Sequence, residues 1–154
     1  MRAALVLPAL TILSVIAASC GGEPVTGDIK ATFKGASFKP EFGVAIEGQA
    51  GTNPGGMFIF VGNGDIDCTN AETSPPDGTY VIGNLKAKAV GSFQDPDGGI
   101  SVAKIDTTHF ESVSSGNGVV NIDSLDGDSV KGSMTMDDGS GTTVAGSFVV
   151  KKCF

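Results

Sequence analysis

The sequence predicts an all-β domain, an antiparallel meander of about eight to ten strands that forms a small barrel or sandwich. Twenty-three glycines, no tryptophan and few long helix formers disfavour helices. After residue 20, no stretch repeats apolar residues at the i, i+3, i+4 and i+7 spacing of an amphipathic helix. Alternation of apolar and polar residues is instead frequent, and its short runs end at clusters of Gly, Pro, Asn and Asp.

The first strand is expected at residues 29–34, where alternate residues are apolar and would face the core. A second is expected at 38–47, and Pro40 near its start suits an edge or a strand beginning. Residues 57–61 form a continuous apolar run, which is typical of a strand buried on both faces.

The middle of the chain predicts a loop followed by four short strands. Residues 68–78 contain Ser-Pro-Pro-Asp-Gly and read as loop. The strands are expected at 79–83, 86–93, 100–106 and 109–114. Residues 95–99, Asp-Pro-Asp-Gly-Gly, predict a hairpin turn between the second and the third of them.

The last third predicts three strands, at 118–125, 129–136 and 142–151. We expect a hairpin centred on Gly139, with Met134 opposite Val144 and Gly132 opposite Gly146. Glycines facing each other inside two strands would leave room for tight curvature.

Charge excludes one class of partner. Residues 20–154 hold nine Lys, no Arg and seventeen Asp or Glu, which gives a formal charge of −8. An acidic domain without arginine is repelled by nucleic acid and by anionic lipid surfaces. We therefore expect no nucleic-acid binding, and about 135 residues are enough for a single domain, placed at 28–154.

Residues 1–19 are expected to be a signal peptide. Arg2 is followed by an uncharged, mainly apolar stretch that is shorter than the roughly 20 residues a spanning helix needs. Pro8 and polar residues also interrupt it.

Ala17-Ala18-Ser19-Cys20 resembles the lipobox of bacterial lipoproteins, a family that prefers Leu, Val or Ile where this chain has Ala17. The resemblance implies cleavage before Cys20 and acylation of Cys20 by palmitate-type chains, so that the membrane is a partner through the lipid anchor. Residues 20–27 would then be the acylated cysteine and a flexible tether, within about 20 Å of the membrane. Ordinary cleavage after Ser19, which leaves Cys20 as a free thiol, is the alternative.

Gly21 bears on the location. Lipoproteins retained in the inner membrane of enteric bacteria carry Asp at this position, so the resemblance favours the outer membrane of the cell envelope. In a Gram-positive cell the same anchor would lie on the plasma membrane. The last forty or so residues are loosely similar to the ends of small uncharacterised β-rich lipoproteins of Gram-negative bacteria, a similarity that implies no activity.

The chain has three cysteines. Lipidation of Cys20 would leave Cys68 and Cys153 as an even pair in an oxidising compartment. A disulfide between them would close a long loop and, in the chain-entropy model, stabilise the folded state by about 4.5 kcal/mol. Two buried free thiols remain an alternative, as does a metal site, which the single histidine and the lack of a CxxC motif disfavour.

Motifs for catalysis or cofactors are scarce. His109 is the single histidine, on an expected strand, and the sequence has no G-x-S-x-G elbow and no phosphate-binding loop. Most paired aspartates sit with glycine, where they favour turns. Asp123, Asp126 and Asp128 are the best candidates for a weak calcium site, and no cofactor is expected.

These observations predict a lipid-anchored β-domain of the cell envelope, with a non-enzymatic binding or structural role and an unidentified protein or small-molecule partner. A lipocalin-like carrier of a small apolar ligand is the alternative, and it would need a closed sheet around an apolar cavity. A hydrolase comes third, and it would need His109 beside a serine or carboxylate in a cleft.

Overall fold

The computed structural model describes residues 21–49 and 52–154. Eleven strands and one helix of a single turn make up the fold, which confirms the predicted all-β class. The elements are β1 (Lys30–Phe33), β2 (Ala36–Phe38), β3 (Phe42–Glu47), β4 (Met57–Gly62), α1 (Cys68–Ala71), β5 (Gly78–Leu85), β6 (Gly91–Phe93), β7 (Gly98–Ile105), β8 (Phe110–Ser115), β9 (Val119–Ser124), β10 (Ser129–Asp137) and β11 (Thr143–Lys152).

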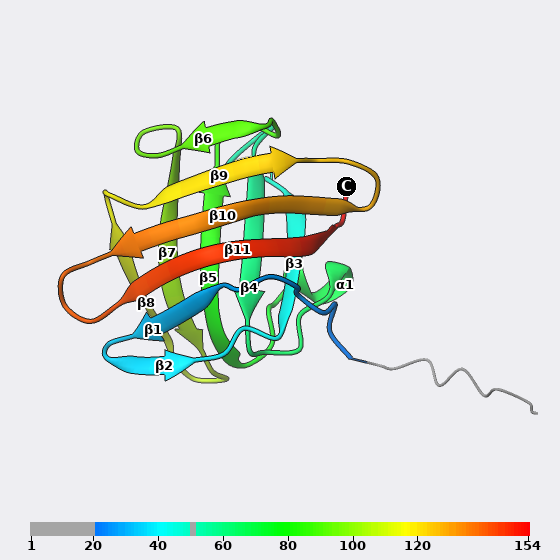
Figure 1. The fold of residues 1–154 in the computed structure, drawn as a ribbon. Coiled ribbons are helices and arrows are strands. Elements are labelled where there is room, and N and C mark those ends of the chain that lie inside the picture. Colours follow the sequence, from blue (N-terminus) through cyan, green and yellow to red (C-terminus); the bar gives the residue numbers. More distant parts are fainter. Residues whose placement is uncertain (1–20, 50–51) are drawn as a thin grey trace, which may run out of the picture.

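The strands form one sheet that curls into a half-barrel. Its order is β6-β9-β10-β11-β3-β4-β5-β7-β8, with β1 paired to β11 and β2 paired to β1. In Figure 1 the strands β6, β9, β10, β11, β1 and β2 form one layer, and the remaining strands cross behind it at a steep angle. The pairs are antiparallel except β11 with β3, which run parallel at Lys151↔Val44 and Lys152↔Ala45.

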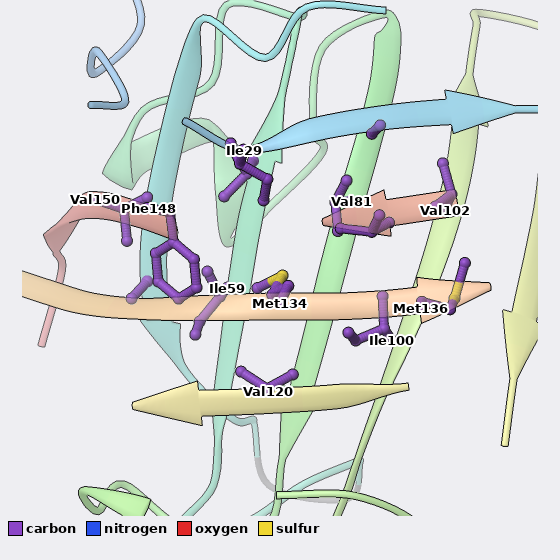
Figure 2. Packing of buried hydrophobic residues seen from close by; sticks show 14 of the residues in the cluster. Ile29, Ile59, Val81, Ile100, Val102, Val120, Met134, Met136, Phe148 and Val150 are labelled. Atoms are coloured by element: carbon purple, nitrogen blue, oxygen red, sulfur yellow. The ribbon is translucent and has the colours of Figure 1, made fainter. Parts of the chain in front are cut away.

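The main core lies between these two layers. On β1 and the residue before it, Ile29, Ala31 and Phe33 are buried and Lys30 is exposed, as the alternation predicts. The core is filled by aliphatic, Met and Phe side chains from both layers (Figure 2), including Ile29, Ile59, Val81, Ile100, Val102, Val120, Met134, Met136, Phe148 and Val150.

A second apolar cluster lies on the opposite face of β3, β4 and β5. It contains Val44, Ile46, Phe60, Ile66, Ala71 and Tyr80. Because α1 and the residues beside it contribute Ile66 and Ala71, they cover this face of the sheet. This cover explains why β4 is a continuous apolar run: its odd-numbered residues face the main core, and Phe60 faces the second cluster.

The predicted register of the last hairpin is wrong by two residues. Met134 lies opposite Gly146, and Gly132 lies opposite Phe148, so the two glycines do not face each other. The hairpin centres one residue later than Gly139, since Asp137 pairs with Thr143 and the Asp138 N–H donates to the carbonyl of Thr142, which leaves residues 139–141 as the turn. A shift of two residues keeps the same side chains inside, so the alternation alone does not distinguish the two registers.

The predicted hairpin turn at 95–99 is also wrong. Leu85 pairs with Gly98, so β5 and β7 are neighbours, and residues 86–97 make an excursion from that edge. Within the excursion only Gly91–Phe93 is a strand, β6, and it pairs with β9 in the other layer.

Two further segments differ from their predicted boundaries. The expected strand at 38–47 is divided into β2 and β3 by residues 39–41, which include Pro40. The expected loop at 68–78 begins with α1, because Asp67 and Asn70 form a capping box that satisfies the free N–H groups of this short turn.

Candidate anchor site at the N-terminal end of the domain

The candidate lipidation residue, Cys20, lies outside the described residues, as does the expected signal peptide. The described chain begins at the next residue, Gly21. The structure therefore bears on the immediate surroundings of the anchor, and these surroundings differ from the flexible tether that the sequence predicts for residues 20–27.

Residues 22–27 are hydrogen-bonded to the domain. The Glu23 N–H donates to the carbonyl of Ile66 (2.8 Å), and the carbonyl of Glu23 accepts from the N–H of Gly43 (2.8 Å). Further along, Thr26 and Val149 exchange two backbone hydrogen bonds, of 3.1 and 2.6 Å. The segment is thus attached to three parts of the fold: the residues before α1, β3 and β11.

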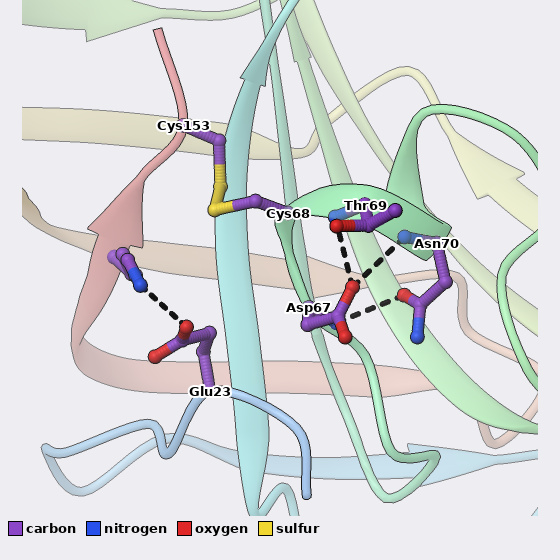
Figure 3. The surroundings of a disulfide bond; sticks show 7 residues. Glu23, Asp67, Cys68, Thr69, Asn70 and Cys153 are labelled. Carbon is purple, nitrogen blue, oxygen red and sulfur yellow. Dashed lines mark hydrogen bonds and ion pairs between the residues drawn. A yellow bond between two sulfur atoms is a disulfide. The ribbon is translucent and has the colours of Figure 1, made fainter. Parts of the chain in front are cut away.

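Two side-chain interactions reinforce this attachment. The Gly22 N–H donates to Oδ1 of Asp65. Glu23 forms an ion pair with Lys151 of β11 (Figure 3), and the hydrogen bond and charge of Glu23 raise the pKa of Lys151. Sequence reasoning missed both contacts, since Glu23 and Lys151 are 128 residues apart and nothing local marks them as partners.

The predicted disulfide is present beside this site. Cys68 begins α1 and Cys153 follows β11, and their sulfur atoms are bonded (Figure 3) with the Cα atoms 5.5 Å apart. The Cys153 N–H also donates to the carbonyl of Ala45 in β3. The bond therefore ties the end of the last strand to the cover of the second cluster, as expected.

Gly22 lies against the backbone of the residues before α1. A Cβ atom added at Gly22 would come within 2.7 Å of the N and O atoms of Ile66. Asn70 of α1 in turn donates from its side-chain amide to the carbonyl of Asp65 (3.0 Å). The N-terminal segment, the residues before α1 and α1 itself are thus connected, and Figure 1 shows the blue start of the described chain near α1.

His109 lies on an exposed turn between β7 and β8. Its side chain is 81% exposed, its Nδ1 is 2.6 Å from Oγ1 of Thr108, and the same hydroxyl donates to Asp106. The carboxylate of Asp106 also accepts hydrogen bonds from the backbone N–H groups of Thr108 and His109. Together with the bond from the Thr108 hydroxyl, these hydrogen bonds lower the pKa of Asp106. This geometry is that of an aspartate-stabilised turn.

The acidic residues proposed for calcium do not cluster with one another among the residues that the structure describes. In the described part of the chain, no three His, Cys, Asp or Glu side chains gather into a group that could hold a metal ion, so Asp123, Asp126 and Asp128 are not brought together. Two backbone carbonyls of this region accept hydrogen bonds within the fold. The carbonyl of Asp126 accepts from the N–H of Ser129, and the carbonyl of Asp128 accepts from the N–H of Lys152.

Two of the hollows on the described surface differ in polarity. A groove of about 390 Å³, which we call the polar groove, lies at one end of β5, β7 and β8. Its lining is mixed and includes the polar side chains of Asn84, Lys86, Asp95, Ser101 and Ser114 and the apolar ones of Ile82 and Ile100. A more apolar hollow of about 410 Å³ lies against β1 and β2. The side chains of the main core lie between the two sheet layers, where a lipocalin-like carrier would need an apolar cavity.

Among the helices that the structure describes, none has the length and apolar character to cross a membrane. The chain matches no protein-family model, no curated protein and no solved structure.

Proposed function

We propose that this chain is a lipid-anchored β-domain of the bacterial cell envelope, attached to the membrane through an acylated Cys20. The observation that carries the proposal is the distribution of its three cysteines. Cys68 and Cys153 are joined to each other, and Cys20 follows directly after an apolar leader with small residues at its end. A disulfide also fits export, because such bonds persist in oxidising compartments.

The role that we propose for the domain is non-enzymatic, either binding or structural. Two features support this. The hydroxyl beside His109 and the carboxylate of Asp106 are engaged in holding an exposed turn. The polar groove, by contrast, presents amide, hydroxyl and charged side chains that suit reversible binding of a small polar molecule.

Because Gly21 follows the cysteine, we propose the outer membrane as the location in a Gram-negative host. The acidic character of the domain fits attachment through the lipid and not through attraction to anionic headgroups.

The proposal is tested by expressing the full chain, leader included, in a bacterial host and comparing it with the Cys20→Ser variant. The native protein should partition into detergent, and its N-terminal peptide should begin at Cys20 with the added mass of a diacylglyceryl group. The Cys20→Ser variant should lack this mass and stay in the aqueous phase.

A water-soluble native protein whose mature N-terminus carries an unmodified thiol would overturn the proposal. Separate inner- and outer-membrane fractions test the location independently, so a correct anchor with a wrong membrane is recognised.

A further inference from the structure

We propose that, on the anchored protein, the end of the molecule around α1 lies against the lipid headgroups, and that the polar groove and β6 are directed away from the membrane. This orientation rests on the proposed acylation of Cys20. We call the surface concerned the anchor-side face and define it by Glu23, Asp65, Asp67 and Thr69. Its partner is a lipid surface.

The first step is the short reach of the anchor. Gly22 is bonded to Asp65 and Glu23 to Ile66, so the chain is attached to the domain from residue 22 onward. Only two residue steps separate Gly22 from Cys20, and an extended chain spans at most about 7 Å over that length. A free tether up to residue 28 would allow about 28 Å.

The second step is the direction that this reach imposes. The acyl chains of Cys20 must enter the bilayer, so the residues next to Gly22 are held near the headgroups. Asp65 is one of these residues, because it accepts the hydrogen bond from Gly22. α1 is held close as well, because its Asn70 side chain donates to the carbonyl of Asp65. In Figure 1 the entry of the N-terminal chain lies beside α1, and β6 lies at the opposite end of the molecule.

The third step is the chemistry of the face. Asp65 and Thr69 are exposed and polar, so the face suits the headgroup layer and not the hydrocarbon. The carboxylates of Glu23, Asp65 and Asp67 outnumber the one neighbouring cation, Lys151, so the face carries a net negative charge. The contact is therefore imposed by the short anchor and not by attraction to anionic lipid, which separates this arrangement from binding through a polybasic patch.

The consequence concerns the groove. Asn84 and Gly98, at the groove, lie at the ends of β5 and β7 that are opposite to Gly78 and Ile105. Gly78 lies against Gly64, the residue before Asp65. Six residue steps along β5 lead from Gly78 to Asn84, or roughly 20 Å. With the anchor-side face on the lipid, the groove stays open to the aqueous compartment.

The test uses tryptophan reporters, since the chain has no tryptophan of its own. Thr69→Trp places a reporter in α1, and Val90→Trp places one next to β6 at a side chain that is 62% exposed. Each acylated variant is reconstituted into zwitterionic phosphatidylcholine vesicles that contain a lipid with a nitroxide on its headgroup. We expect the nitroxide to quench Thr69→Trp several-fold more strongly than Val90→Trp.

A matched control inserts ten Gly and Ser residues between Gly21 and Gly22, which should reduce the difference between the reporters while the protein still floats with the vesicles. Equal quenching of the two reporters, or stronger quenching of Val90→Trp, in protein that floats would overturn the orientation and leave the anchor intact. Protein that does not float would overturn the anchor, and the orientation with it.

Discussion

Single residues fix the local geometry of β11 and its turn. Gly146 has φ +129°, a conformation that side-chain-bearing residues rarely adopt, and a Cβ atom there would lie 2.7 Å from the Cα of Ile29. The glycine therefore allows β11 to curve closely around the residues before β1.

We expect Gly146→Ala to lower the free energy of unfolding by about 2 kcal/mol or more, because both the backbone conformation and the contact with Ile29 are then strained. Urea unfolding of a soluble form that begins at Gly21 measures it. Gly99→Ala is the matched control, since Gly99 also lies in a strand, has no positive φ and would contact nothing within 4 Å. A Gly146→Ala variant as stable as the control would contradict this account.

Asp138 stabilises the β10–β11 turn. Its carboxylate accepts from the hydroxyl and the N–H of Ser140 and from the N–H of Thr142, and these hydrogen bonds lower its pKa from 3.8 to about 2. Because the pKa is lower in the folded state, the associated stability is present above about pH 4 and is lost as the pH falls through 2.

Asp138→Ala should therefore be less stable than the parent at pH 7, and the difference between them should shrink as the pH approaches 2. Unfolding curves recorded across this pH range give the result. Asp97→Ala, at a loop aspartate with no side-chain hydrogen bond in the described part of the chain, should change stability by less than about 0.5 kcal/mol at pH 7. A pH-independent effect of Asp138→Ala would exclude the carboxylate as its cause.

At the scale of elements, the last strand, β11, and the disulfide that follows it hold the two layers together. β11 pairs with β10 along its length, with β1 in its first half and with β3 at its end. The disulfide follows immediately, joining Cys153 to α1 and closing a separation of 85 residues. The second apolar cluster therefore depends on a covalent bond to the last strand as well as on packing.

Replacing both Cys68 and Cys153 by Ser should destabilise the domain by about 3 to 4.5 kcal/mol, mainly because the unfolded chain gains freedom. The measurement is urea unfolding of the soluble form, with Cys20 absent so that no third thiol interferes. Adding a reductant should bring the parent to the stability of the double variant. Equal stability of the oxidised parent and the double variant would contradict a structural role for the bond.

The sequence predicts which faces of single strands are buried, but it does not predict how distant strands pair. The inward faces of β1 and β10 follow from local alternation, and the burial of β4 on both faces follows from its continuous apolar run, so both were predictable. The pairing of β6 with β9 was not, because it depends on residues 86–97 leaving the β5 edge and reaching the other layer. The register of the last hairpin was not predictable either, because the side-chain hydrogen bonds of Asp138 to Ser140 and Thr142 stabilise a turn one residue further along, and this shift leaves the alternation unchanged.

For the whole molecule, the N-terminal segment is part of the fold and not a spacer. Composition predicted flexibility for residues 21–27 because they include three glycines and a proline. The structure instead gives this segment backbone partners on Ile66, Gly43 and Val149. Such contacts between distant residues have no local sequence signal, so the candidate cysteine was predictable and its rigid surroundings were not.

A form of the domain that begins at Asp28 should be less stable than one that begins at Gly21, by about 2 kcal/mol or more, since several backbone hydrogen bonds and the Glu23–Lys151 ion pair are lost. Thermal or urea unfolding of the two soluble forms gives the difference. A flexible tether would instead give two forms of equal stability.

The central claim is that Cys20 is acylated while Cys68 and Cys153 are paired, and the most direct measurement is the intact mass of the protein purified from its native membrane, before and after reduction. The account predicts a chain that begins at Cys20, carries the mass of its acyl groups and gains two hydrogen atoms on reduction. A chain of unmodified mass that retains its leader, or one that begins at Cys20 with a free thiol, would contradict it.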